Sequence, residues 1–141
     1  MSLKAERDLN PTSRNQVNRA KTAVQSKNYD YAITLLQATL KDEPLFLEGR
    51  RLLRAVEIQK YKATGTFTRQ MTSMRMSGGV MKLSSAKKTP QELLIQAEEI
   101  LTQDPYQPKA NAMIGEAGVA LGYPEFKAFA YETLADGKPT D

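Results

Sequence analysis

Apolar residues recur every three or four positions along most of this chain, which is the spacing that one face of an amphipathic α-helix requires. The first such stripe predicts a helix over about residues 13–26, with Thr12 and Ser13 as candidate N-caps. A second stripe predicts a helix over about 29–40 that ends before Pro44. Because so short a turn joins the two helices, we expect them to pack as an antiparallel hairpin.

The same period continues through the rest of the sequence. It predicts four more helices, over about 45–62, 90–101, 108–121 and 124–136. Thr89 and Pro90 mark one beginning, since threonine caps a helix and proline is tolerated in its first turn. No stretch alternates apolar and polar residues for long enough to predict a strand. The sequence therefore predicts an all-α protein of three helix pairs.

Prolines close the second helix of each pair at related positions. Pro105 and Pro139 are 34 residues apart, and Pro44 and Pro105 are 61 apart, which is 34 plus an insertion of 27. The insertion corresponds in length to a Gly-, Met- and Lys/Arg-rich segment over about 63–88. A helix–turn–helix unit that repeats every 34 residues is typical of the tetratricopeptide repeat (TPR).

Short motifs strengthen this resemblance to the TPR family. Twelve residues separate Ala32, in the motif Tyr-Asp-Tyr-Ala-Ile, from Pro44, and Ala20 and Gly115 supply the small residue of the first helix. The resemblance implies a TPR-like helical-hairpin solenoid, with Ala20, Ala32, Leu36 and Ile114 in its core. The implied segments are a lead-in at 1–12, a repeat domain at 13–139 made of repeats at 13–44, 45–105 and 106–139, and the start of a further repeat at 140–141.

Composition removes much enzyme chemistry from consideration. The 141 residues include no Cys and no His, which excludes thiol nucleophiles, Ser-His couples, disulfides and Cys/His metal sites. The carboxylates form no convincing pair: Glu98 and Glu99 are adjacent and diverge on a helix, whereas Glu92 and Glu99 share a face as ordinary exposed positions do. We therefore expect no catalytic residue, no metal, no cofactor and no enzymatic activity.

The apolar segments are short throughout the sequence. Residues 1–7 carry charges with no apolar stretch behind them, so we expect neither a signal peptide nor an anchor. No apolar run approaches the roughly 18–20 residues that cross a bilayer. The lack of Cys also fits a reducing compartment. We therefore expect a cytoplasmic protein.

Charge is distributed unevenly along the chain, although the net charge is only +4. Residues 1–88 carry 17 Lys+Arg and 7 Asp+Glu, or +10, and residues 89–141 carry 3 and 9, or −6. Residues 58–91 contain no acidic side chain, and their seven cations form a basic arm, namely Lys60, Lys62, Arg69, Arg75, Lys82, Lys87 and Lys88. This arm could dock on an acidic lipid surface, a nucleic acid or an acidic protein. Alternatively, it is a long loop that folds back through Phe67, Met71 and Met74.

The TPR resemblance implies a non-enzymatic scaffold that binds a partner peptide or helix on the concave face, which the first helix of each pair lines. The implied partner groove consists of Arg14, Val17, Lys21, Arg51, Ala55, Ile58, Lys109, Ala112 and Glu116. The alternative function is binding of an anionic surface through residues 58–91. The last helix carries Phe126 and Phe129, and we expect at least one ring to face the position of a next repeat. This predicts either a piece of a longer repeat protein or self-association through the C-terminal helix.

Overall fold

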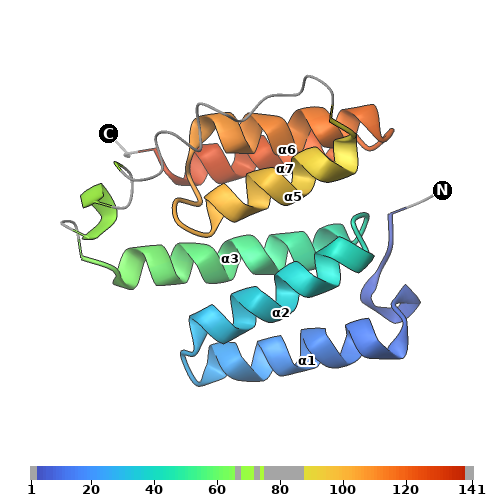
Figure 1. The fold of residues 1–141 in the computed structure, drawn as a ribbon, viewed down its shortest axis with the longest axis horizontal. Helices are drawn as coiled ribbons and strands as arrows, with labels where there is room; N and C mark the ends of the chain where they lie inside the picture. The colour runs from blue at the N-terminus through green and yellow to red at the C-terminus, as the bar shows by residue number, and fades with distance from the viewer. Residues whose placement is uncertain (1–2, 66–67, 72–73, 75–87, 139–141) are drawn as a thin grey trace. The chain divides into compact units, whose positions relative to one another are not determined.

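The computed structural model describes residues 3–65, 68–71, 74 and 88–138, and over these ranges the chain forms helices and turns without any strand (Figure 1). The prediction of an all-α protein is therefore confirmed for the described residues. The chain divides into two compact units, Met1–Lys60 (unit 1) and Tyr61–Asp141 (unit 2), with the boundary inside a helix. None of the described helices combines the length and the apolar character that crossing a lipid bilayer requires.

Each of the six predicted helices is observed, with ends that differ by at most two residues. They are the α-helices α1 (Pro11–Gln25), α2 (Tyr29–Asp42), α3 (Leu47–Ala63), α5 (Pro90–Leu101), α6 (Pro108–Ala120) and α7 (Glu125–Asp136). The lead-in also contains a 3₁₀-helix, η1 (Glu6–Asp8), which the sequence analysis did not predict.

The helix caps explain one error in the sequence prediction. Helix α1 begins at Pro11 because the side chain of Asn10 accepts a hydrogen bond of 2.8 Å from the backbone N–H of Ser13. The prediction of Thr12 or Ser13 as the N-cap is therefore wrong. Thr89, by contrast, caps α5 as predicted, through a reciprocal pair of hydrogen bonds with Glu92.

Unit 1 buries one apolar cluster to which α1, α2 and α3 all contribute. The helix stripes predicted from the sequence supply it, since Ala20, Ala32 and Leu36 have no exposed surface. The predicted core role of these three residues is confirmed. The small side chains of Ala20 and Ala32 favour a close approach of α1 and α2, which pack against each other in this hairpin.

Unit 2 is built around α6, which packs against both α5 and α7. Ile114 is fully buried as predicted. Phe126 and Phe129 are also buried, at 0% and 4% exposed, so the prediction that at least one of their rings faces outward is wrong. A Cβ atom at Gly118 would lie only 2.0 Å from the Cβ of Phe126. The bare backbone of α6 at Gly118 thus makes room for Phe126 of α7.

The two hairpin turns have the same hydrogen-bonded geometry. In unit 1, the N–H groups of Lys27 and Asn28 donate to the carbonyls of Val24 and Ala23, at 2.9 and 2.8 Å. The turn after α6 repeats this pattern, with 2.9 Å bonds from Gly122 to Val119 and from Tyr123 to Gly118. Lys27 and Gly122 both have positive φ, of 59° and 95°. Both first helices therefore end in a Schellman motif.

The junctions that precede α1, α3 and α6 also share one contact. In each case the fourth residue of the helix donates a 3.0 Å side-chain hydrogen bond back to a carbonyl of the preceding segment. The donor–acceptor pairs are Arg14–Leu9, Arg50–Pro44 and Asn111–Pro105. Arg50 and Asn111 are 61 residues apart, as are Pro44 and Pro105. The separation of the two prolines is therefore matched by an equivalent hydrogen bond at each.

Candidate functional site: an apolar groove between α6 and α7

The residues predicted to form a partner groove lie on α1, α3 and α6, and most of them are on the surface. Arg14, Lys21, Arg51, Ala55, Lys109, Ala112 and Glu116 are exposed, and Ile58 is partly exposed. Val17 is the exception, because it is only 1% exposed and belongs to the core cluster of unit 1. Its position on the apolar stripe of α1 makes it a core residue, so Val17 is removed from the candidate site.

On α1, the predicted basic residues make contacts within unit 1. The Nε of Arg14 donates to the carbonyl of Leu9, and the ammonium of Lys21 lies 2.8 Å from a carboxylate oxygen of Glu6. Both side chains remain exposed, so these contacts position the charges without removing them from solvent. Exposed ion pairs of this kind contribute only about 0–1 kcal/mol to stability.

Ala112 and Glu116, in contrast, take part in a defined depression of the surface. A groove of about 450 Å³ lies between α6 and α7 of unit 2. Its lining residues are Ala112, Gly115, Glu116, Val119, Ala120, Lys127, Ala130, Tyr131 and Leu134. Most of these side chains are small or apolar, and the two charged ones, Glu116 and Lys127, come from opposite walls. Such a groove can take apolar side chains of a partner.

The floor of the groove lies where α6 and α7 approach each other closely. A Cβ atom at Gly115 would lie 3.3 Å from the backbone Cα of Lys127. The walls rise at Val119 and Tyr131, whose side chains are 48% and 62% exposed. The ammonium of Lys127 lies 5.9 Å from the centroid of the Tyr131 ring and can hold it by a cation–π interaction. The groove therefore combines an apolar floor with a positioned aromatic wall.

Sequence analysis missed the α7 wall of this groove. It gave the outward position on α7 to Phe126 and Phe129, whereas Tyr131 occupies it. The signal was available in the spacing: Phe126, Phe129, Ala130 and Thr133 are the buried residues of α7 and fall at i, i+3, i+4 and i+7. Tyr131 lies outside that set, so the periodicity alone places its ring on the surface.

The described part of the basic arm is largely engaged in contacts within its own unit. Lys60 forms a 2.6 Å ion pair with Asp30, and Lys88 donates a 2.6 Å hydrogen bond to Gln96. The guanidinium of Arg69 lies 4.9 Å from the centroid of the Tyr61 ring. Lys62 is exposed. Arg75, Lys82, Lys87 and Phe67 lie outside the described residues. Met71 and Met74, which would fold back if the segment were only a long loop, are 37% and 71% exposed.

The remaining acid–base groups of note lie in the turn before α6. Burial raises the pKa of the Asp104 carboxyl, although the backbone N–H of Tyr106 donates to it at 3.0 Å and partly opposes the shift. Burial also raises the pKa of Tyr106, whose hydroxyl donates to Asp136 at 2.7 Å. Both groups act as structural hydrogen-bond partners. No cluster of three or more His, Cys, Asp or Glu suited to a metal ion occurs among the residues that the structure describes.

Comparison of the chain with protein families, with curated proteins and with solved structures found no match. What the chain binds is therefore inferred from its own surfaces.

Proposed function

We propose that this chain is a non-enzymatic protein-interaction module of the TPR type, with three helix pairs and a basic insertion in the second. The repeated elements support this proposal. Two hairpins end their first helix in the same Schellman motif, and three helix starts share the same backward hydrogen bond. A chain that repeats one helix-pair unit forms extended surfaces on which a partner peptide or helix can bind.

The α6–α7 groove carries the proposal. It exposes Val119 and Tyr131 beside a floor of small residues, and its two charged side chains, Glu116 and Lys127, come from opposite walls. Exposed aromatic side chains beside shallow apolar depressions are the usual anchors of protein interfaces, where tyrosine is enriched. We infer that the partner contributes an apolar side chain to the floor and packs against the Tyr131 ring.

The test is a selection of peptides from a random library displayed on phage, with the full chain as target. Selected peptides are then labelled, and their affinity for the chain is measured by fluorescence anisotropy. Tyr131→Ser and Val119→Lys alter only exposed positions, so they should leave the melting temperature nearly unchanged. We expect each to weaken peptide binding by roughly tenfold or more, as truncation of an interface anchor does.

Tyr31→Ser is the matched control, because it removes an exposed tyrosine that also lies beside a cation, but in unit 1. It should leave peptide binding unchanged. If no peptide is selected, or if the selected peptides bind Tyr131→Ser and Val119→Lys as tightly as the original chain, the α6–α7 groove is not a partner site and the proposal fails.

A further inference from the structure

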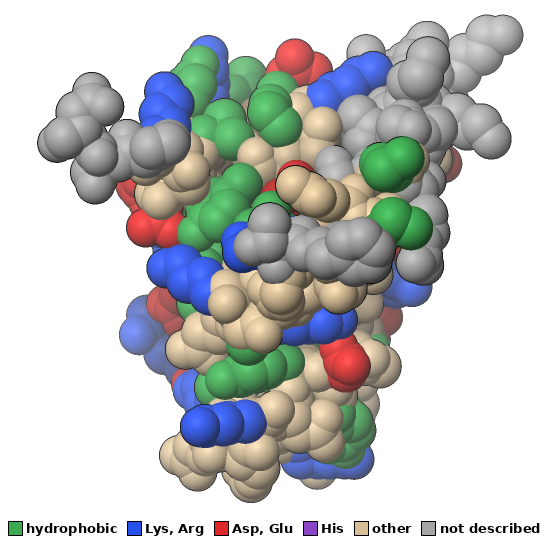
Figure 2. Space-filling view, turned by 90° about the vertical axis from the view of Figure 1, so that its left-hand side faces the viewer, with side chains coloured by type: hydrophobic (Ala, Val, Ile, Leu, Met, Phe, Trp, Pro, Cys, Tyr) green, Lys and Arg blue, Asp and Glu red, His purple; other side chains and the backbone are tan. Residues whose placement is uncertain are grey.

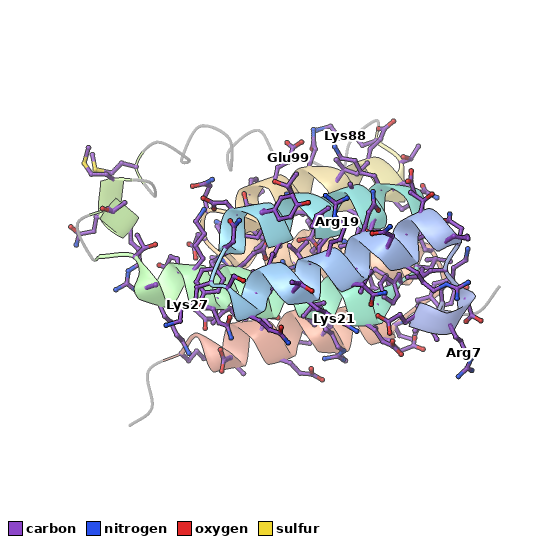
Figure 3. All side chains as sticks on the ribbon, turned by 90° about the horizontal axis from the view of Figure 1, so that it is seen from below. Arg7, Arg19, Lys21, Lys27, Lys88 and Glu99 are labelled. Carbon is purple, nitrogen blue, oxygen red and sulfur yellow. The ribbon has the colours of Figure 1, made fainter. Side chains whose placement is uncertain are left out.

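The exposed surface of α1 differs in character from the α6–α7 groove. Between Asp8 and Asp30 the sequence has no acidic residue, while Arg14, Arg19, Lys21 and Lys27 contribute four positive charges. All four side chains are exposed. Figure 3 shows Arg19 and Lys21 on opposite sides of α1, Lys27 at the end where α1 turns into α2, and Arg7 beyond the opposite end. The exposed side of α1 therefore carries cations on both flanks, with Lys21 paired to Glu6 on one flank and Arg19 beside Tyr31 on the other.

An open pocket of about 420 Å³ lies on one flank of α1, where α1 and α2 meet. Its lining residues are Asn18, Arg19, Thr22, Ala23, Ser26, Asn28 and Tyr31. Apart from Ala23, each offers a hydrogen-bonding group, and no carboxylate lines the pocket. In Figure 2 this end of unit 1, at the bottom of the view, is covered mainly by uncharged polar side chains and backbone, with blue cationic side chains beside them.

Tyr31 is the aromatic member of the pocket and is held in place by two contacts. Its backbone N–H donates to the side chain of Asn28, the N-cap of α2. Its hydroxyl accepts a hydrogen bond from the guanidinium of Arg19, whose Cζ lies 5.5 Å from the ring centroid. The ring is 38% exposed. A positioned aromatic ring beside a guanidinium is the arrangement on which an unpaired nucleobase stacks.

We propose that unit 1 binds single-stranded nucleic acid, with one base stacked on Tyr31 in the pocket and the backbone phosphates along α1. The cations of α1 supply the sequence-independent attraction to phosphate. The amides of Asn18 and Asn28 can donate to and accept from a base edge. The site lies in the α1–α2 hairpin and so does not depend on the α6–α7 groove or on peptide binding there.

An acidic lipid surface and duplex DNA fit this site less well. Both present phosphate to the cations of α1, but neither offers an unstacked base to the pocket. The Tyr31 ring would then make no contribution to binding, and affinity would depend on charge alone. The dependence of binding on Tyr31 therefore distinguishes the proposed ligand from these two.

The experiment measures the anisotropy of fluorescein-labelled oligouridylate and oligothymidylate of about twelve nucleotides, titrated with the full chain between about 50 and 200 mM salt. We expect Tyr31→Ala to weaken binding of both oligonucleotides by roughly tenfold, and Tyr31→Phe to retain most of the affinity because it keeps the stacking ring. Arg19→Gln should weaken binding and reduce the salt dependence by about one charge. Far-UV circular dichroism and the melting temperature check that each variant is folded.

Tyr131→Ala is the matched control, because Tyr131 is also an exposed tyrosine beside a cation, but it lies in the acidic C-terminal segment. It should bind both oligonucleotides like the original chain. The proposal is overturned if the chain binds neither oligonucleotide at low salt, or if Tyr31→Ala binds as tightly as Tyr31→Phe. It is likewise overturned if a duplex of the same length, or vesicles containing phosphatidylserine, bind as tightly as the single strands. Because peptide binding is expected to survive Tyr31→Ala, failure of this site is distinguishable from failure of the α6–α7 groove.

Discussion

The α1–α2 hairpin and the α6–α7 hairpin have turns of the same backbone geometry, but the side chains around the two turns differ. Each first helix ends at a residue with positive φ, and each turn is closed by the same two backbone hydrogen bonds. Around this shared turn, the first hairpin exposes cations and amides, whereas the second exposes Val119 and Tyr131. The same few backbone hydrogen bonds therefore close both hairpins, and the exposed side chains around each turn are free to differ in their binding chemistry.

The two hairpins also differ in how their helices touch. In α1–α2 the fully buried residues include the alanines Ala20 and Ala32. In α6–α7 the close contact is made at a glycine, because Gly118 faces the large ring of Phe126. At Gly118 the Phe126 side chain occupies the space next to the glycine backbone, so a methyl group added to Gly118 would meet α7 directly. The second hairpin should therefore be the less tolerant of change.

Removing the Phe126 ring should have the largest effect. The ring is fully buried, so Phe126→Ala is expected to lower the free energy of unfolding by roughly 3–5 kcal/mol, through lost burial and the cavity left behind. Urea denaturation followed by far-UV circular dichroism measures it. Tyr131→Ala, an aromatic truncation on the same helix at an exposed position, should change stability by no more than about 0.5 kcal/mol. Equal losses in the two variants would contradict the burial assigned to Phe126.

Adding one methyl group at Gly118 should be the next largest change. Glycine-to-alanine substitution within a helix normally stabilises it by about 1 kcal/mol. At Gly118, however, the new Cβ would lie 2.0 Å from the Phe126 Cβ, close to the backbone of α7, and cannot be accommodated by a rotamer change. We therefore expect Gly118→Ala to destabilise the protein by about 1–3 kcal/mol in urea denaturation.

Ala23 provides the control for Gly118, since the two residues hold the same place in their turns: the carbonyl of Ala23 accepts from the N–H of Asn28, and that of Gly118 from the N–H of Tyr123. Ala23→Gly should destabilise by about 1–2 kcal/mol, because it loosens the helix backbone and removes one buried methyl group. A stabilising Gly118→Ala would show that α6 and α7 are not in close contact there.

Exchanging the positive-φ residues of the two turns should give smaller effects of opposite sign. Lys27→Gly relieves the left-handed conformation of a side-chain-bearing residue and should stabilise the protein by about 0.5–1 kcal/mol. Gly122→Lys imposes that conformation on a lysine and should destabilise it by about 1 kcal/mol. Melting temperatures measure both. If the two substitutions shift the melting temperature in the same direction, the turns are not equivalent.

The smallest expected effect is a change in the pH dependence of stability when Asp104 is replaced. Because burial raises its pKa in the folded state, the folded protein binds this proton more tightly than the unfolded chain. The corresponding stability is present below the unfolded pKa of about 3.9 and is lost as the pH rises through the folded value. Asp104→Asn keeps an acceptor for the Tyr106 N–H without the charge. We therefore expect its stability relative to the original chain to increase from acidic to neutral pH.

The control for Asp104 is Asp104→Ala, which also removes the acceptor. It should be less stable than Asp104→Asn at every pH, since the backbone N–H of Tyr106 loses its partner. A stability difference between Asp104→Asn and the original chain that is constant with pH would mean that Asp104 titrates as a fully exposed carboxyl does.

The sequence by itself determined the helices, because period, caps and breakers act over a few residues. The apolar stripe of α2 and the Thr89 cap of α5 follow from local spacing, and the TPR resemblance placed Ala20, Ala32, Leu36 and Ile114 in the core, where they are buried. The 61-residue separation of Pro44 and Pro105 can also be read from the sequence, and the structure places an equivalent hydrogen bond at each proline, donated by Arg50 and Asn111. The N-cap of α1 was predicted at Thr12 or Ser13, two or three residues after the observed cap at Asn10, within the same short polar segment.

Only the tertiary structure decided how closely separate helices approach and what surface lies between them. The ring of Phe126 packs where Gly118, in another helix, leaves it room. The α6–α7 groove likewise depends on how closely α6 and α7 approach at Gly115. Distances between helices depend on the volumes of side chains that meet from separate segments, and a periodicity within one segment carries no information about that meeting.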